Sequence, residues 1–208
     1  MKRKNSSAFG AHVFLGKGVE IEAGALVGYR PSRSIKDEKT FIGEFSHIRA
    51  GAIIYAGTRI GEKLETGHHV IIREENQIGD GVCIWSHSMV DYGCRIGHHV
   101  KIHNHVYLAQ YTVLEEDVFV GPGTVTTNDK YIVLKSFPGP HIHKGARVGA
   151  GVVLLPGVHV GSNSLVGSGS VVTKDIPDGT VAYGNPARVH GSIKAFEAQR
   201  KKILELSE

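Results

Sequence analysis

A six-residue repeat runs through the middle of this 208-residue chain and limits its possible folds more than any other feature. From Ile42 to Thr126, every sixth residue is aliphatic or threonine. The residue four positions after each of these is small or apolar, with Asn76 as the exception. Because a period of six fits neither an α-helix nor one alternating strand, it indicates an internal structural repeat.

A longer period of 18 residues lies on top of the first, because the dipeptide Ile-Gly recurs at positions 42, 60, 78 and 96. Three six-residue units therefore make one turn of a coil. β-Branched residues favour short strands, and glycine tolerates tight corners. The pattern predicts an all-β solenoid with three sides, in which both series of residues point into a narrow core.

Two insertions interrupt the repeat. A charged segment at about 29–40 separates a weak first repeat from the main one, and residues 128–141 separate the main repeat from its continuation at 142–176. We expect both to be loops, and the longer second one to be functional, because an insertion of that size in a regular fold more often has a function than not.

The C-terminal part follows a different pattern. We expect residues 178–189 to form a loop and residues 192–206 a short helix, because Ile193, Phe196, Ile203 and Leu206 recur at helical spacing. The chain then divides into a solenoid domain at 1–189 and a helical extension at 190–208.

Composition excludes several classes of protein. The 24 basic and 20 acidic residues give a net charge of +4, and the basic excess lies at the chain ends without aromatic platforms or a recognised motif, so we expect no nucleic-acid partner. No apolar run approaches a membrane span, and no hydrophobic leader follows the first residues, which predicts a soluble cytoplasmic protein. We expect Cys83 and Cys94 to be free thiols.

Three of the 13 histidines are spaced by the coil period, at His69, His87 and His105. Strands stacked about 4.8 Å apart would arrange their rings as a ladder. Such a column can simply stack on an exposed face, but histidine is also the natural base near neutral pH. His105 lies closest in sequence to the second insertion, and His103 stands two residues before it.

Several stretches resemble a known family. The hexads at 78–83, 148–153 and 166–171, with the ending at 171–177 and 183–188, look like the hexapeptide-repeat acyltransferases of left-handed parallel β-helix fold. The resemblance covers roughly residues 15–190. It implies left-handed coils, a homotrimer with active sites between adjacent subunits, and an acyl-CoA donor.

A narrower resemblance concerns the acceptor. Residues 114–122 and 127–131 are similar to the branch of that family that acetylates amino groups on nucleotide-linked deoxysugars, and to related sugar O-acetyltransferases. From their place in the histidine column and near the second insertion, we expect His105 or His103 to orient or deprotonate the acceptor. The resemblance suggests that the Asn128-Asp129 pair shares this role, although turn formation alone could also explain that pair. Further acceptor contacts would come from His87, Gln110 and Tyr131, although members of that branch often have an acidic residue where Gln110 stands.

The donor would lie near the C-terminal coils. Gly149, Ala150 and Gly167 leave backbone amides open to pantetheine. Lys174 and Arg188 are candidates for the phosphates of coenzyme A, or they are ordinary surface charges. We therefore expect an acetyl-CoA-dependent acetyltransferase that modifies an amino or hydroxyl group of a nucleotide-linked sugar, with no metal, nucleic-acid or membrane partner.

The sequence also leaves three alternatives open. His98 and His103 are spaced like the paired zinc ligands of carbonic anhydrases built on the same β-helix, but the third ligand would fall at Glu62. His98 could also act as a general base in its own right. A non-catalytic scaffold for protein assembly would bind no coenzyme A.

Overall fold

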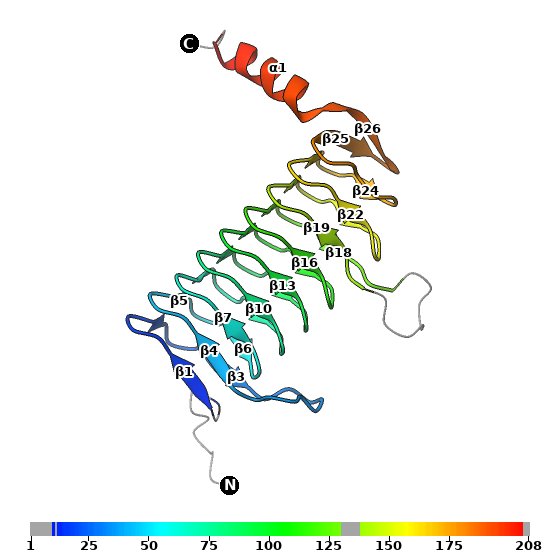
Figure 1. Cartoon of the computed structure of the whole chain (residues 1–208). Coiled ribbons are helices and arrows are strands. Elements are labelled where there is room, and N and C mark those ends of the chain that lie inside the picture. Colours follow the sequence, from blue (N-terminus) through cyan, green and yellow to red (C-terminus); the bar gives the residue numbers. More distant parts are fainter. Residues whose placement is uncertain (1–9, 11, 130–137, 206–208) are drawn as a thin grey trace.

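The protein is a three-sided parallel β-helix followed by a hairpin and a helix (Figure 1). The computed structural model describes residues 10, 12–129 and 138–205. Successive strands lie on different sides of the solenoid, and strands 18 residues apart pair in parallel, as Ile78 does with Ile96. The predicted all-β solenoid with a short C-terminal helix is confirmed.

Each side of the solenoid is one sheet. Sheet 1 contains β1 (Val13–Leu15), β4 (Thr40–Ile42), β7 (Arg59–Ile60), β10 (Gln77–Ile78), β13 (Arg95–Ile96), β16 (Val113–Leu114), β19 (His141–Ile142) and β22 (His159–Val160). Sheet 2 contains β2 (Glu20–Ile21), β5 (His47–Ile48), β8 (Glu65–Thr66), β11 (Cys83–Ile84), β14 (Lys101–Ile102), β17 (Phe119–Val120), β20 (Arg147–Val148), β23 (Leu165–Val166), β25 (Thr180–Gly184) and β26 (Ala187–Ser192). Sheet 3 contains β3 (Leu26–Tyr29), β6 (Ile53–Tyr55), β9 (Ile71–Ile72), β12 (Met89–Val90), β15 (Tyr107–Leu108), β18 (Val125–Thr126), β21 (Val153–Leu154) and β24 (Val171–Val172).

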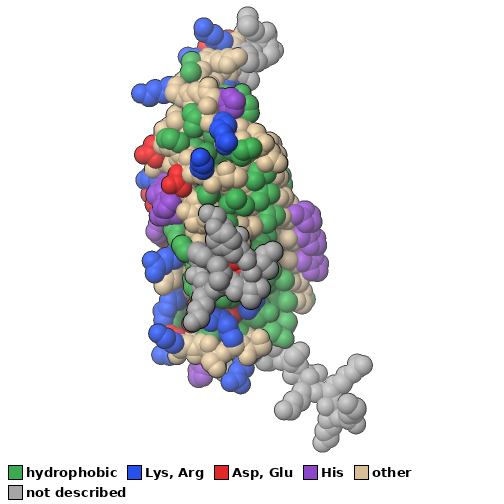
Figure 2. All heavy atoms as spheres, turned by 90° about the vertical axis from the view of Figure 1, so that its right-hand side faces the viewer, with side chains coloured by type: hydrophobic (Ala, Val, Ile, Leu, Met, Phe, Trp, Pro, Cys, Tyr) green, Lys and Arg blue, Asp and Glu red, His purple; other side chains and the backbone are tan. Residues whose placement is uncertain are grey.

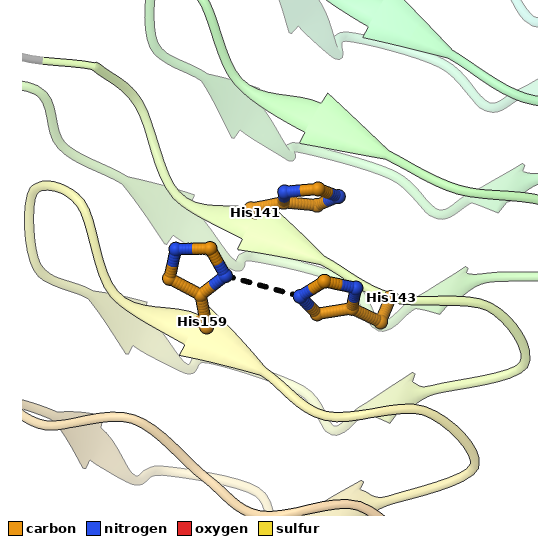
Figure 3. Close-up of side chains that lie close together, drawn as sticks. All are labelled: His141, His143 and His159. Carbon is orange, nitrogen blue, oxygen red and sulfur yellow. Dashed lines mark hydrogen bonds between the residues drawn. The ribbon is translucent and has the colours of Figure 1, made fainter.

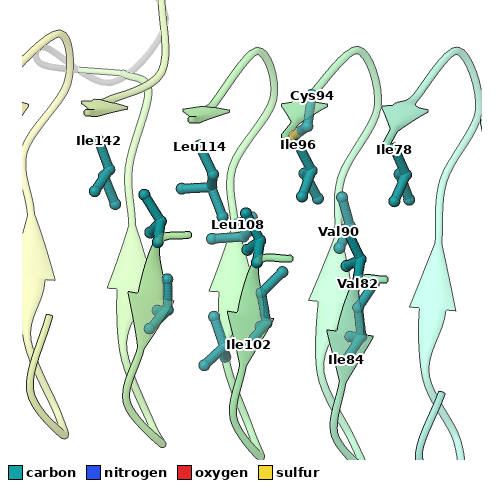
Figure 4. Packing of buried hydrophobic residues seen from close by; sticks show 14 of the residues in the cluster. Ile78, Val82, Ile84, Val90, Cys94, Ile96, Ile102, Leu108, Leu114 and Ile142 are labelled. Atoms are coloured by element: carbon teal, nitrogen blue, oxygen red, sulfur yellow. The ribbon is translucent and has the colours of Figure 1, made fainter. Parts of the chain in front are cut away.

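Both series of the six-residue repeat point into the core, as predicted. Every member from position 42 to 126 is at most 5 % exposed. Equivalent residues of successive coils stack on one another in columns (Figure 4). The exception, Asn76, fits because both ends of its amide are hydrogen-bonded to backbone. Its Nδ2 donates to the Arg73 carbonyl at 2.8 Å, and its Oδ1 accepts from the Cys94 N–H at 2.7 Å. A buried amide bonded in this way does not carry the cost of an unpaired polar group.

Both insertions leave the solenoid at the same corner, between sheets 3 and 1. The first lies between β3 and β4 and shifts the sequence spacing, so that Leu15 pairs with Ile42 and Ile21 with Ile48. The second lies between β18 and β19, and residues 130–137 of it fall outside the described part of the chain.

The expectation of a loop at residues 178–189 is wrong. β25 and β26 form an antiparallel hairpin, and β25 also pairs with β23 of the last coil. The last strand of a solenoid has unpaired backbone groups, and the hairpin satisfies them while it covers the end of the core with Ala182. Helix α1 (Ile193–Glu205) follows directly, and Leu206 of the predicted apolar stripe lies outside the described residues.

The two cysteines are free, as expected. Cys94 is buried, and burial raises the pKa of its thiol to about 12. Within the described ranges, no helix has both the length and the apolar character that crossing a bilayer requires.

Candidate functional site

The corners of the solenoid form long edges, and most predicted site residues lie on or beside two of them. The edge between sheets 3 and 1, where both insertions begin, is called the loop edge here. The edge between sheets 2 and 3 is called the histidine edge. In the coils from β5 to β24 it holds one residue of positive φ per coil, namely Gly51, His69, His87, His105, Gly123, Gly151 and Gly169.

The three histidines of this edge form the predicted ladder. The ring centroids of His69 and His87 are 5.3 Å apart, and those of His87 and His105 are 5.2 Å apart, with interplanar angles of 14° and 5°. All three side chains are exposed. A stacked group of histidines projects from the right-hand side of the view in Figure 2.

His105 is the last ring of the ladder. One face stacks on His87, and the next position along the edge, Gly123, has no side chain. Beyond it, a Cβ added at Gly151 or Gly169 would meet no atom within 4 Å. An imidazole therefore stands at the start of a stretch of edge whose backbone is open to solvent.

Gly149 and Gly167, which were predicted to leave backbone open to the pantetheine of the acyl donor, also have a packing role. A Cβ on Gly149 would lie 2.6 Å from the backbone nitrogen of Ser168, and one on Gly167 would lie 2.8 Å from Cβ of Tyr183. Both lead into the histidine edge, and the N–H of Ala150 between the coils donates to Ser168 Oγ at 3.1 Å. The absence of a side chain at Gly149 and Gly167 is thus explained by the stacking of coils.

The two basic residues predicted to bind donor phosphates lie apart from that stretch, whereas His103 lies two residues before His105 at the start of the histidine edge. Lys174 is exposed at the loop edge, and Arg188 is exposed on β26. The ring of His103 is half-buried and packs against Phe119, with a centroid distance of 5.3 Å, and against Trp85, at 6.1 Å.

The loop edge contains a hydrogen-bonded relay that ends at Asn128. Asp91, which is only 3 % exposed, accepts from the Tyr107 hydroxyl at 2.9 Å and from Gln110 Nε2 at 2.5 Å. Gln110 Oε1 in turn accepts from Asn128 Nδ2. Burial and the bond to Asp91 raise the pKa of Tyr107 to about 12, so it remains a donor at neutral pH. The sequence-based prediction included Gln110 and Asn128 but missed Asp91 and Tyr107.

A second carboxylate is buried beside this relay. The Glu74 side chain is fully buried and accepts from Nε and Nη2 of Arg73 at 2.8 and 2.9 Å, and from Arg33 Nε at 2.5 Å. Burial alone would raise the pKa of Glu74, but the bonds from the two guanidinium groups outweigh it and hold this pKa below the ordinary 4.5. Arg33 belongs to the first insertion and also lies over the Tyr92 ring, at 4.2 Å from its centroid. These contacts connect the first insertion to the loop edge.

The predicted catalytic residues do not form one constellation within a single chain. His105 precedes β15 and Gln110 follows it, so they lie at opposite ends of that strand, His105 on the histidine edge and Gln110 on the loop edge. Five extended residues place them about 16 Å apart. Asn128 and the exposed Asp129 lie with Gln110 at the loop edge. Tyr131 lies outside the described residues.

The zinc triad of the carbonic anhydrase alternative does not converge within one chain either. His98 lies at the corner between sheets 1 and 2, where its Nδ1 accepts from the Asp80 N–H at 3.0 Å. His103 follows β14 at the other end of sheet 2. In the described residues, the group of side chains placed to hold a metal is a different one, His141, His143 and His159.

That second histidine group lies on the outer face of sheet 1 around Glu115. Glu115 Oε1 is 2.7 Å from His141 Nε2 and 3.0 Å from His143 Nδ1, and Oε2 accepts from the Lys144 N–H at 2.9 Å. Burial lowers the pKa of His141, whereas these contacts hold the pKa of Glu115 below its ordinary value despite burial. The sequence signal for this group is the spacing of His141 and His159 by 18 residues, which is one coil.

Comparisons with known proteins find a family that has the same six-residue repeat. Residues 139–174 match the family model described as bacterial transferase hexapeptide (six repeats). The bifunctional protein GlmU of Synechococcus sp. (strain RCC307) is 30 % identical over an alignment of 169 residues that covers 69 % of this chain and 34 % of that protein. The dTDP-3-amino-3,6-dideoxy-alpha-D-galactopyranose 3-N-acetyltransferase of Aneurinibacillus thermoaerophilus is 38 % identical over 69 residues, which are 33 % of this chain and 36 % of that protein. The matches thus span about a third of the length of these two relatives.

A solved structure agrees over most of the chain. LpxA, a UDP-N-acetylglucosamine acyltransferase from Bacteroides fragilis, superimposes with a TM-score of 0.73 over 92 % of this chain and 75 % of that one. At 19 % identity this likeness is one of fold. The chain is a hexapeptide-repeat protein with the left-handed parallel β-helix fold. Among proteins of this class, it is similar in sequence to GlmU proteins and to a nucleotide-sugar N-acetyltransferase.

Proposed function

We propose that this protein is an acetyl-CoA-dependent acyltransferase whose acceptor is an amino or hydroxyl group on a nucleotide-linked sugar. The observation that carries the proposal is the end of the histidine ladder, where His105 adjoins the side-chain-free positions Gly123, Gly151 and Gly169. An extended pantetheine arm needs such open backbone. Gly151 and Gly169 lie within the stretch that matches the transferase family model, and the named acceptor of one relative is an amino sugar linked to a nucleotide.

The chemistry requires one proton to move from the acceptor to the leaving thiolate. The acceptor nitrogen or oxygen attacks the thioester carbonyl, the C–S bond breaks, and the acceptor proton moves to His105 Nδ1 or Nε2 and from there to the leaving thiolate. A positioned base of this kind contributes about 10²–10⁴-fold to the rate. The N–H groups of Gly123, Gly151 and Gly169 already donate to carbonyls of the preceding coil, so the hydrogen bonds to the tetrahedral oxyanion must come from other groups beside the edge.

We further propose that the complete site forms between copies of the chain in a homotrimer. The outer face of sheet 3, which separates the histidine edge from the loop edge, is apolar, unlike the charged positions Arg59, Arg95 and Lys101 on the other two sheets. Its outward residues are half-buried and comprise Ile53, Ile71, Met89, Tyr107, Val125, Val153 and Val171. Figure 2 shows hydrophobic side chains beside the projecting histidines. A cyclic trimer that buries this face would bring His105 of one copy to the relay end at Asn128 of the next.

The direct test is titration calorimetry with acetyl-CoA, followed by transfer assays with a panel of nucleotide-linked amino sugars and their hydroxyl counterparts. We expect micromolar donor binding and turnover with at least one acceptor of this class. A protein that binds no coenzyme A derivative would contradict the proposal and favour a non-catalytic scaffold.

Mixed trimers test the shared site. His105→Ala and Asn128→Ala chains should each be nearly inactive alone, whereas their co-expressed mixture should recover about a quarter of the wild-type rate, because random assembly leaves one intact site in each mixed trimer. The matched control is a trimer in which every chain carries both substitutions, and it should stay inactive. Recovery would be absent if each chain formed its own complete site.

A further inference from the structure

The second histidine group differs from the ladder in the way its rings are arranged. His141 and His159 are direct neighbours on β19 and β22, and His143 stands two residues after His141 on the same outer face of sheet 1. In Figure 3, His143 and His159 point toward one another, with His141 beside them. The ladder rings are parallel and one coil apart, so their nitrogens do not meet at one point, whereas these three rings come from only two coils and face a common space.

The distances within this group suit a metal ion. One ligand nitrogen from each ring lies within 4.8 Å of the others, and His143 Nε2 is 3.0 Å from His159 Nδ1. Zinc–nitrogen bonds of 2.0–2.1 Å in a tetrahedral site place the nitrogens about 3.3 Å apart, so small side-chain rotations suffice. His141 and His143 are half-buried, and His159 is exposed, which leaves one side open to solvent.

Glu115 fixes the orientation of the His143 ring. Its Oε1 faces His143 Nδ1 at 3.0 Å, which leaves Nε2 of that ring directed at His159. Its other oxygen is fixed by the backbone N–H of Lys144 at 2.9 Å. A carboxylate on the outer nitrogen of a ligating histidine fixes the tautomer and orientation of the ring, as second-shell groups do at zinc sites.

We propose that His141, His143 and His159 bind a divalent transition-metal ion of the zinc class, oriented by Glu115. Imidazole ligands favour zinc, copper and nickel over magnesium or calcium. The ligands come from the first two coils after the second insertion, and Glu115 comes from the coil before it. A bound ion would therefore link β19 to β22, with Glu115 connecting the ligands to the coil before the insertion, and would stabilise the folded chain by mass action. The site is independent of the proposed acyltransferase activity.

The test uses tag-free full-length protein, stripped with a chelator and titrated with zinc chloride by calorimetry. We expect one zinc ion per chain with a Kd of about a micromolar or below. The His159→Asn variant should lose this site, and Glu115→Gln should weaken it about 10- to 100-fold. Both side chains lie on the outer face, so neither variant threatens the core.

The ladder supplies the matched control. His87→Asn removes a ring from the rival histidine group and should leave zinc binding unchanged. Cobalt(II) in the wild-type protein should show the intense visible bands of a four-coordinate site, and these should be absent from His159→Asn. The proposal would be overturned if the wild-type protein bound no zinc, if His159→Asn still bound it, or if His87→Asn abolished binding.

Discussion

The His105→Ala variant is expected to lower kcat by about 10²-fold or more, while its affinity for acetyl-CoA changes little. The ring is exposed at the end of the ladder, so its removal costs little packing, and the open backbone beyond it is left as it was. Steady-state kinetics with both substrates saturating give kcat, and calorimetry gives the donor affinity.

The His69→Ala variant is the matched control for that experiment. His69 has the same residue type, edge and backbone conformation, with φ of 56° against 58° for His105, but it lies two coils away. We expect its kcat to stay within a few-fold of the wild-type value. Unchanged turnover in His105→Ala, or an equal loss in both variants, would contradict the assignment of His105 as the base.

The Glu74→Ala variant is expected to lower the free energy of unfolding by about 3 kcal/mol, because it removes the fully buried carboxylate shared by Arg73 and Arg33. Of the described carboxylates, Arg73 then keeps only Asp91, at 3.4 Å, and Arg33 keeps only the half-buried Glu75. Denaturant unfolding at neutral pH measures this loss. The control is Glu75→Ala. Glu75 also bonds Arg33, but its side chain is 35 % exposed, so we expect a loss of at most about 1 kcal/mol.

The loss should also depend on pH in a defined direction. The pKa of Glu74 is lower in the folded chain than its ordinary value of 4.5, so the carboxylate stabilises the fold fully above that value. Its contribution disappears as the pH falls through the folded-state pKa. The difference in unfolding free energy between wild type and Glu74→Ala should therefore be constant near neutral pH and shrink below about pH 4.5. A difference that persists at lower pH would mean that packing, rather than charge, explains the loss.

The core and the ladder could be predicted because both depend only on constant spacing along the chain. A residue whose neighbours 18 positions away are like itself stacks on them wherever no insertion intervenes, and this holds for the Ile78 column as it does for His69, His87 and His105. Even Asn76 keeps its inward position, since its amide bonds the backbone of its own coil and of the next.

The relay from Asp91 to Asn128 was only half visible in the sequence. The spacing of Gln110 and Asn128 by one coil places them side by side, but Asp91 occupies a neighbouring column, and nothing in the spacing shows that its side chain turns toward Gln110. The terminal hairpin was missed for a similar reason, because its partner is the exposed edge of β23 rather than any repeat in its own sequence.

The sequence by itself determined the three-sided coil, the inward residues and the histidine ladder, because a fixed period converts position along the chain directly into position in space. Only the tertiary structure decided that His105 and Asn128 lie at opposite ends of sheet 3, and that Glu115 meets His141, His143 and His159. The first depends on which corner each turn occupies, and the second on strands that an insertion separates in sequence. Register across an insertion is set by backbone pairing between strands, which no local spacing encodes.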